Sequence, residues 1–258
     1  MNILLTNDDG VNAEGLQYLA EALRSGGKYR VTVIAPDINR SGISQALSLL
    51  NGPVKLARLG EDTFSCSGYP ADCVIVALMG ALPEKPDLVL SGINHGANLG
   101  TDIVYSGTVA AARQAGLAGI PAVALSLVGS DPFHWDMAAS WCADNLEGLA
   151  AFWVKGTFVN VNIPNSPAGP DGIAVTRPAA KRYNDTLSVM AAPDGNLWCF
   201  LEAGQEAVVT EAGFDCEAVS RNLVSVSSVC NLPAVKKEPG APEAGIFAAA
   251  SCRSGKKD

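Results

Sequence analysis

Two adjacent carboxylates, Asp8 and Asp9, directly follow the first apolar run of the sequence. Carboxylates this close repel each other, and keeping both ionised near a partly buried site is costly unless a cation neutralises them. A bound divalent ion would remove that cost. The alternative is a plain turn, because the stretch Asn7 to Gly10 consists of residue types that reverse the chain and cap helices.

Two further segments carry groups that bind metals or anions. In Pro36 to Gly42, the Ser41 hydroxyl can supply an oxygen to a hard metal, and Arg40 can pair either with a phosphate or with a surface carboxylate. In Ser91 to Gly100, glycines recur at intervals of four residues, so the backbone can approach a ligand closely. Asn94 in this segment offers a carbonyl oxygen suited to Mg²⁺ or Mn²⁺.

A fourth segment, Tyr105 to Thr108, precedes an Ala-rich helical pattern. Ser106, Gly107 and Thr108 would lie at a helix start, where unpaired backbone N–H groups and the helix dipole favour an anion. A plain helix cap would explain the same residues. A metal- and anion-binding site is favoured over plain turns and caps only if all four segments lie close together in the fold.

The elements expected around these segments predict such a meeting. Short apolar runs alternate with helical patterns over the first two-thirds of the chain, which is typical of a parallel sheet covered by helices. We expect strands at residues 2–6, 30–35, 87–91, 121–126 and 157–163, and helices near 16–23, 108–117 and 137–153. The fold class is therefore α/β, a Rossmann-like, mostly parallel sheet flanked by helices. Ligands of such sheets bind beyond the carboxyl ends of the strands.

The C-terminal third follows a different pattern. From about Asp171, helical periodicity fades, and Gly, Pro, Asn and Asp punctuate short β-like runs such as 197–201 and 223–229. We divide the chain into an α/β catalytic core at 1–170 and a β-rich C-terminal extension at 171–235, which is expected to contact a neighbouring copy. Residues 236–258 have little to bury and are expected to form a flexible tail.

Composition limits the classes of partner. The 258 residues are 48% hydrophobic and 17% charged, and a formal charge of −8 argues against a nucleic-acid surface, which needs clustered Lys and Arg. The sequence shows neither a signal peptide nor an apolar run that could span a membrane, so a cytoplasmic location without membrane contact is expected. Seven cysteines without a C-x-x-C pair indicate free thiols in a reducing compartment.

Other catalytic machineries fit poorly. No G-x-S-x-G, H-E-x-x-H or G-K-[ST] motif occurs, and Asp8 and Asp9 are adjacent, unlike the D-x-D pair of aspartyl-phosphate phosphatases. The only histidines are His95 and His134, which excludes a zinc site built from several histidines. Oxygen ligands with a metal-activated water remain.

The same segments resemble one protein family. ILLTNDDG at residues 3–10, APD through RSG at 35–42, GYPADCV at 68–74, SGINHGAN at 91–98 and SGTV at 106–109 are similar, in this order, to motifs of the SurE family of stationary-phase survival proteins. The resemblance implies a metal-dependent 5′(3′)-nucleotidase. It also implies a homodimer or homotetramer in which the C-terminal segment reaches across to a partner.

The resemblance further implies roles for particular residues. One divalent ion per subunit, Mg²⁺ or Mn²⁺, would be bound by Asp8, Asp9, Ser41 and Asn94. The phosphate would be contacted near Ser41, Gly42, Asn98 and Ser106 to Thr108.

We therefore expect a metal-dependent phosphatase that hydrolyses nucleoside 5′-monophosphates to nucleoside and phosphate, with 3′-monophosphates left open. Either Asp8 or Asp9 could take a proton from the attacking water, and Asn7 is a candidate substrate contact. His95 either protonates the leaving group or is a spectator. Two alternatives stay open: a phosphohydrolase of polyphosphate or sugar phosphates, and a non-catalytic nucleotide- or metal-binding sensor.

Overall fold

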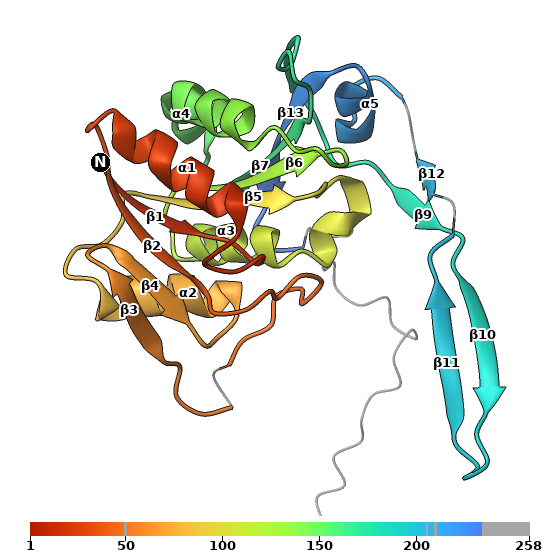
Figure 1. Ribbon diagram of the computed structural model, residues 1–258. Helices are drawn as coiled ribbons and strands as arrows, with labels where there is room; N and C mark the ends of the chain where they lie inside the picture. The colour runs from red at the N-terminus through yellow and green to blue at the C-terminus, as the bar shows by residue number, and fades with distance from the viewer. Residues whose placement is uncertain (49–50, 205, 209–210, 234–258) are drawn as a thin grey trace, which may run out of the picture.

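A nine-stranded sheet forms the centre of the molecule (Figure 1). The computed structural model describes residues 1–48, 51–204, 206–208 and 211–233. In spatial order the strands are β3 (Leu56–Gly60), β4 (Thr63–Cys66), β2 (Arg30–Pro36), β1 (Asn2–Thr6), β5 (Leu88–His95), β6 (Ala122–Val128), β7 (Thr157–Pro164), β13 (Leu223–Cys230) and β8 (Gly172–Val175). The six strands from β4 to β7 are parallel, which confirms the predicted α/β fold.

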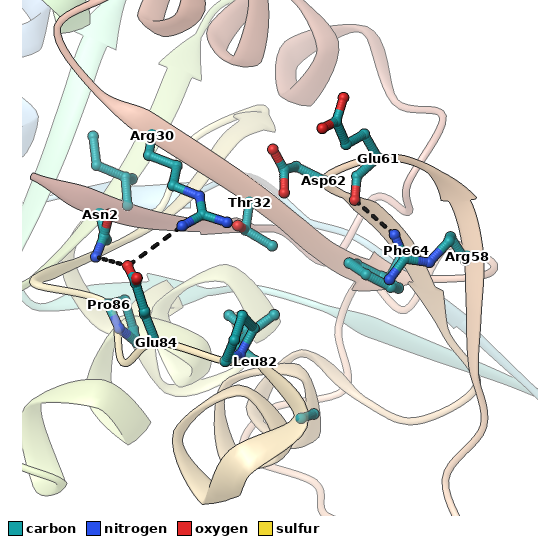
Figure 2. Close-up of a pocket in the computed structure, with 13 residues that line it drawn as sticks. Asn2, Arg30, Thr32, Arg58, Glu61, Asp62, Phe64, Leu82, Glu84 and Pro86 are labelled. Carbon is teal, nitrogen blue, oxygen red and sulfur yellow. Dashed lines mark hydrogen bonds and ion pairs between the residues drawn. The ribbon is translucent and has the colours of Figure 1, made fainter.

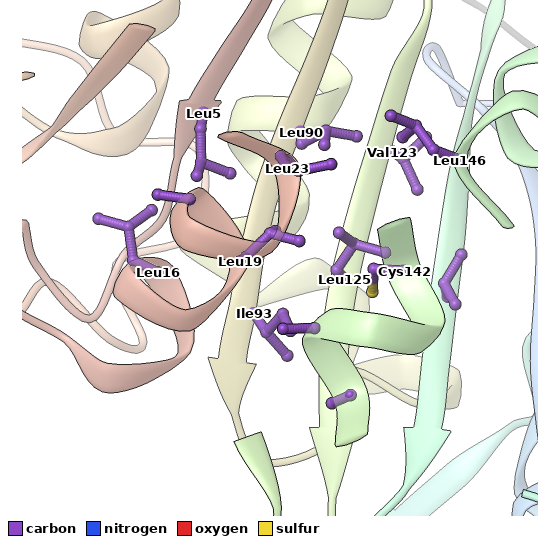
Figure 3. Close-up of a cluster of buried hydrophobic side chains, with 14 of the residues drawn as sticks. Leu5, Leu16, Leu19, Leu23, Leu90, Ile93, Val123, Leu125, Cys142 and Leu146 are labelled. Atoms are coloured by element: carbon purple, nitrogen blue, oxygen red, sulfur yellow. The ribbon is translucent and has the colours of Figure 1, made fainter. Parts of the chain in front are cut away.

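Helices cover both faces of this sheet (Figure 1). The helices α1 (Glu14–Ser25) and α4 (Trp135–Phe152) pack together on one face, and α2 (Pro70–Val76) and α3 (Gly107–Leu117) pack together on the other. Alternation along β1 serves both layers, since Ile3 and Leu5 join the core under α1 and α4, whereas Leu4 joins the core under α2 and α3. Figure 3 shows the first of these cores, with Leu16, Leu19 and Leu23 of α1 directed at the sheet.

The order of the strands reverses beside β1. The chain builds β2 and β4 on one side of β1 and then crosses over to build β5, β6 and β7 on the other. At such a reversal the loops after neighbouring strands diverge and leave a crevice, where ligands of open α/β sheets bind. The segments that follow β1 and β5 therefore face each other across the position where chemistry is expected.

The sheet extends beyond residue 170, where the sequence pattern placed the end of the core. Both β8 and β13 belong to the main sheet, and β13 runs antiparallel to β7. The short helix α5 (Asp215–Ser220) packs against β13. What projects from the body is narrower, an arm made of β9 (Lys181–Tyr183) paired with β12 (Glu206–Val208) and of the hairpin β10 (Thr186–Ala191) with β11 (Leu197–Glu202) (Figure 1).

The predictions of a C-terminal tail and of no membrane contact can be compared only with the residues that the structure describes. The flexible tail expected at 236–258 lies outside them. Within the described part of the chain, no helix combines the length and apolar character that crossing a bilayer requires.

Candidate active site

The loop after β1 carries the two carboxylates, Asp8 and Asp9, and is closed by the side chain of the preceding residue, Asn7. Asn7 donates from Nδ2 to the Gly10 carbonyl at 2.9 Å and accepts from the Gly10 N–H at 3.2 Å. Both ends of the Asn7 amide therefore hold the turn, and this residue lies behind the cavity rather than among its lining residues. Gly10 has a φ of +105°, which favours glycine.

Asp8 is nearly enclosed, with 3% of its surface exposed. Its Oδ1 accepts a hydrogen bond from the Thr108 hydroxyl at the start of α3. Burial raises the pKa of Asp8, and the charge of Asp9 raises it further, whereas the hydrogen bond from Thr108 opposes the shift. The ionised form of Asp8 thus lacks full compensation within the chain.

Close approach of α3 to Asp8 depends on a residue without a side chain. A Cβ added at Gly107 would lie 2.8 Å from Asp8 Cβ and 2.9 Å from Asp8 Oδ2, shorter than real Cβ contacts. Ser106 caps the helix, because its hydroxyl accepts from the Val109 N–H at 3.1 Å. The first N–H groups of this 11-residue helix therefore begin beside the buried carboxylate.

Asp9 is more exposed than Asp8 and is held from two other loops. Its Oδ1 accepts from the Ser41 hydroxyl at 3.4 Å, and its Oδ2 accepts from the His95 backbone N–H at 3.0 Å. The loop of Ser41 is itself tied to the first loop, since the Arg40 N–H donates to the Asp8 carbonyl at 2.7 Å. The segments after β1, β2 and β5 therefore converge, as the sequence predicts.

Asn94, near the end of β5, turns its carbonyl oxygen toward the carboxylates. Its Nδ2 donates to the Gly96 carbonyl at 2.9 Å, and its Oδ1 lies 3.4 Å from the Thr108 hydroxyl that contacts Asp8. The amide is thus oriented by a backbone contact, which leaves the oxygen on the side of the candidate metal ligands.

Asn98 is positioned by residues that sequence reasoning missed. Its backbone N–H donates to Asn162 Oδ1 at 2.9 Å, and its carbonyl accepts from the Asn160 and Asn162 side chains at 2.9 and 3.0 Å. Ser126 accepts from Asn98 Nδ2 at 2.8 Å. The available signal was two amides in an otherwise apolar, buried strand, where a polar side chain needs a partner.

Most of the predicted residues line one cavity of about 280 Å³. From the predicted set it contains Asp8, Ser41, Gly42, Asn94, His95, Asn98 and Ser106. It also contains Ala97, Asp102, Tyr105 and Tyr183, which were not predicted as site residues. A neighbouring hollow shares Ser41 and His95 and adds Asp9. Gly107 and Thr108 are buried behind the cavity against Asp8.

Arg40 points elsewhere. Its Nη2 lies 3.5 Å from Asp37 Oδ1 and donates to the Ser67 carbonyl at 3.2 Å, and its guanidinium lies over the Tyr69 ring. Of the two roles open from the sequence, the geometry supports pairing with a carboxylate. His95, in contrast, is exposed at the cavity, with its ring centroid 4.3 Å from that of Phe133.

Another hollow lies at the opposite edge of the sheet, near the start of β1 and β2 (Figure 2). Both of its arginines contact groups of the chain itself: Arg30 lies 3.4 Å from Glu84, and Arg58 donates to the Glu61 carbonyl at 2.9 Å (Figure 2). This edge is also the wrong end of the strands for a ligand of an open α/β sheet. The cavity at Asp8 is therefore the better candidate.

The donor set of that cavity fits a hard divalent cation. Asp8 and Asp9 offer carboxylates, Ser41 a hydroxyl and Asn94 an amide oxygen, which are the oxygen donors that Mg²⁺, Mn²⁺ and Ca²⁺ take. Among the described residues, no group of three or more His, Cys, Asp or Glu side chains could hold a metal, so a zinc-type site has no support there. A cation would also offset the cost of keeping the buried Asp8 carboxylate ionised.

Comparisons with known proteins show to which family the chain is similar. The family model described as "Survival protein SurE" matches residues 3–185. Proteins called "5'-nucleotidase SurE" are similar to the chain: that of Pelobacter propionicus is 40% identical over 230 residues, 88% of this chain and 92% of that protein. That of Syntrophotalea carbinolica is 42% identical over 234 residues, 88% and 90% of the two chains.

A solved structure matches as well. The crystal structure of the SurE protein from Aquifex aeolicus aligns with a TM-score of 0.80 and 36% identity, and the match covers 91% of this chain and 95% of that one. Family model, relatives and solved structure all span most of the sheet and the loops at its carboxyl edge. The chain belongs to the SurE family.

Proposed function

We propose that this protein is a divalent-metal-dependent 5′-nucleotidase, which hydrolyses nucleoside monophosphates to nucleoside and phosphate. The observation that carries the proposal is the contact of Asp8 with the start of α3: a buried carboxylate that lacks a compensating charge lies against backbone N–H groups that attract anions. A cation on the carboxylate side and a phosphate on the helix side would satisfy both. The name shared by the relatives, 5'-nucleotidase, agrees with this chemistry.

Membership of the SurE family implies dependence on a divalent metal in general. We assign its ligands to Asp8, Asp9, Ser41 and Asn94, with Mg²⁺ or Mn²⁺ as the ion. When bound, such an ion supplies Lewis acidity, which withdraws charge from a phosphoryl group and makes water a better nucleophile. Contacts between these residues support the assignment. Ser41 bonds to Asp9, and the Thr108 hydroxyl bonds to Asp8 and lies 3.4 Å from the Asn94 carbonyl oxygen.

The remaining residues position the substrate. Of the residues at the start of α3, Ser106 lines the cavity and would contact the phosphate, whereas Gly107 and Thr108 lie behind it and hold the helix against Asp8. Asn98 and Gly42 line the same cavity. Asn98 is held by Asn160 and Asn162, so the cost of ordering it is met during folding. We do not extend a binding role to Asn7, because its amide closes the turn at Gly10.

Hydrolysis forms a bond from water oxygen to phosphorus and breaks the bond to the ester oxygen, which leaves with a proton. We assign donation of that proton to His95, which is exposed at both hollows and whose ring is oriented by Phe133. The proton lost by the attacking water goes to Asp9, the more exposed of the two carboxylates. Asp8 is enclosed against Thr108, so an attacking water has less access to it.

A phosphate-release assay tests the proposal. The protein is incubated with AMP, GMP, CMP, 3′-AMP, glucose 6-phosphate and short polyphosphate, each with Mg²⁺, with Mn²⁺ and with a chelator. We expect release from the nucleoside monophosphates that depends on the metal. Faster release from glucose 6-phosphate or polyphosphate would show that one of these, and not a nucleoside monophosphate, is the preferred substrate. Tight binding of nucleotide without phosphate release under any condition would indicate a non-catalytic sensor.

We also propose that the arm contacts a second copy of the chain. All the residues of β10 and β11 are exposed, and the large apolar ones among them include Leu187, Met190, Leu197, Trp198 and Leu201. A two-stranded hairpin is marginal in water by itself, and exposed apolar patches of this kind mark contacts between proteins. This supports the predicted homodimer or homotetramer.

A further inference from the structure

We propose that Tyr105 and Tyr183 form a rim that binds the base of the nucleotide. The inference rests on the proposed nucleotidase function and adds the part of the site that recognises the nucleoside. Both rings line the cavity that contains Asp8, Asn98 and Ser106, and both are exposed, at 59% and 39% of their surface. Tyr105 is the residue directly before Ser106, so this ring lies next to the helix start assigned to the phosphate.

Tyr183 reaches the cavity from far along the chain and is held in place. It belongs to β9, at the root of the arm, and its hydroxyl donates to Asp102. The same carboxylate accepts from Lys181 Nζ at 2.7 Å, and the Lys181 side chain is almost fully buried. Asp102 lies in the short helix η2 (Gly100–Val104), which ends at Tyr105. The two rings are therefore linked through one helical turn.

Further contacts fasten β9 to η2. The buried carboxylate of Asp215 accepts from the backbone N–H groups of Gly100 at 2.7 Å and Ala179 at 2.9 Å. Thr101 bonds to both the N–H and the carbonyl of Lys181, at 2.7 and 3.1 Å. A Cβ at Gly100 would lie 2.5 Å from the Ala179 carbonyl oxygen, which shows how closely the segments pack. Tyr183 is thus set before a ligand arrives, which lowers the entropic cost of binding.

The other aromatic residues near the site are less available. Trp135 is 7% exposed, stacks on Phe133 with ring centroids 5.2 Å apart, and donates from Nε1 to Glu14 at 3.2 Å. The ring of His95 packs against Phe133. Tyr105 and Tyr183 are instead both exposed where they line the cavity, and the Lys181 ammonium lies 5.9 Å from the centroid of the Tyr183 ring. Aromatic faces stack on any base, so the rim predicts tolerance of the base and preference over phosphate esters that lack one.

The test compares a nucleotide with the same phosphate ester without a base. Wild-type protein, Tyr105→Ala and Tyr183→Ala are assayed with AMP and with ribose 5-phosphate in the presence of Mn²⁺. We expect KM for AMP to rise about fivefold or more in each variant, the lower end of base stacking on an aromatic ring, with kcat little changed. The parameters for ribose 5-phosphate should stay at the wild-type values.

Three matched variants separate stacking from a general effect on structure. Tyr105→Phe retains the ring and should restore the KM for AMP. Tyr183→Phe keeps the ring but loses its hydrogen bond to Asp102, so its KM should lie between those of wild type and Tyr183→Ala. Tyr18→Ala removes a tyrosine of similar exposure, 42%, on α1 and should change neither substrate.

Two results would overturn the rim. One is an unchanged KM for AMP in both alanine variants, and the other is an equal loss for AMP and ribose 5-phosphate. If wild-type protein releases no phosphate from either compound, the proposed function is wrong and the rim is judged by calorimetric binding of AMP with Mn²⁺ present. Weaker binding of AMP in the alanine variants then supports the rim, and unchanged binding refutes it.

Discussion

Replacing Gly107 by Ala places one methyl group between α3 and the buried carboxylate. The new Cβ would lie 2.8 Å from Asp8 Cβ, about 0.6 Å short of the 3.4 Å at which ordinary Cβ contacts begin. Pro70 Cγ, at 3.2 Å on another side, restricts movement of the methyl group. Either Asp8 or the start of α3 must therefore shift by roughly half an ångström or more, which changes the distance between the two halves of the proposed site.

The effect on stability should be much smaller than the effect on activity. Ala is favoured over Gly in a helix by up to about 1 kcal/mol, which offsets part of an overpacking cost of about 1–3 kcal/mol. A misplacement of about 1 Å at a reacting centre can cost on the order of 100-fold in rate, so a shift of half that size should cost about tenfold or more. We expect kcat/KM for AMP to fall about tenfold or more while the free energy of unfolding changes by less than about 2 kcal/mol.

The assay combines phosphate release from AMP with thermal unfolding, with Gly148→Ala as the matched control. Gly148 lies in α4, and a Cβ there would meet nothing within 4 Å. That variant should keep wild-type turnover and gain up to about 1 kcal/mol of stability. Wild-type kcat/KM in Gly107→Ala would refute the reasoning, because it would mean that the contact of α3 with Asp8 does not matter for turnover.

The remaining predictions concern the amides, the histidine, the pH dependence and the arm. Asn160→Leu removes a donor to the Asn98 carbonyl, so kcat/KM for AMP should fall at least tenfold, whereas Arg40→Ala should change it less than threefold. His95→Gln should lower kcat for AMP by a factor of about 100, but spare p-nitrophenyl phosphate, whose leaving group needs no proton; equal losses would exclude proton donation. Because the pKa of Asp8 is raised, a proton competes with the metal, and calorimetric Mn²⁺ affinity should fall as pH decreases through that pKa. Because the pKa of Asp8 is higher in the folded than in the unfolded protein, the metal-free protein should lose stability as pH rises through the folded-state pKa. Thr108→Val removes the hydrogen bond that lowers this pKa, so the pH dependence of Mn²⁺ affinity and that of stability should both move to higher pH. Replacing Leu197, Trp198 and Leu201 by Ser should reduce the molar mass measured by light scattering to that of one chain, and an unchanged mass would contradict the role given to the arm.

The sheet and its crevice could be predicted because the signals are local. Strands buried on both faces read as apolar runs, so β1, β2, β5, β6 and β7 were found within a few residues of their ends. The loops that follow them carry polar residues whose convergence is a consequence of parallel pairing. This is why Asp8, Asp9, Ser41 and Asn94 could be proposed together before their distances were known.

Other features depend on contacts that are distant in sequence. The short edge strands β3 and β4 and the seven-residue α2, which begins at Pro70, have too little periodicity to be recognised alone. The place of β13 beside β7 could not be inferred from its pattern, because any half-buried strand reads the same way. Tyr183 enters the cavity only through the packing of β9 on η2, which no local pattern encodes.

The central claim is that the oxygens of Asp8, Asp9, Ser41 and Asn94 hold one divalent cation. The most direct measurement is anomalous diffraction at the manganese edge from crystals grown with saturating Mn²⁺, in wild-type protein and in Asp8→Asn. We predict one strong peak per chain within coordination distance of these four side chains, and its loss in Asp8→Asn. Wild-type crystals that hydrolyse AMP but show no peak at this position would contradict the account.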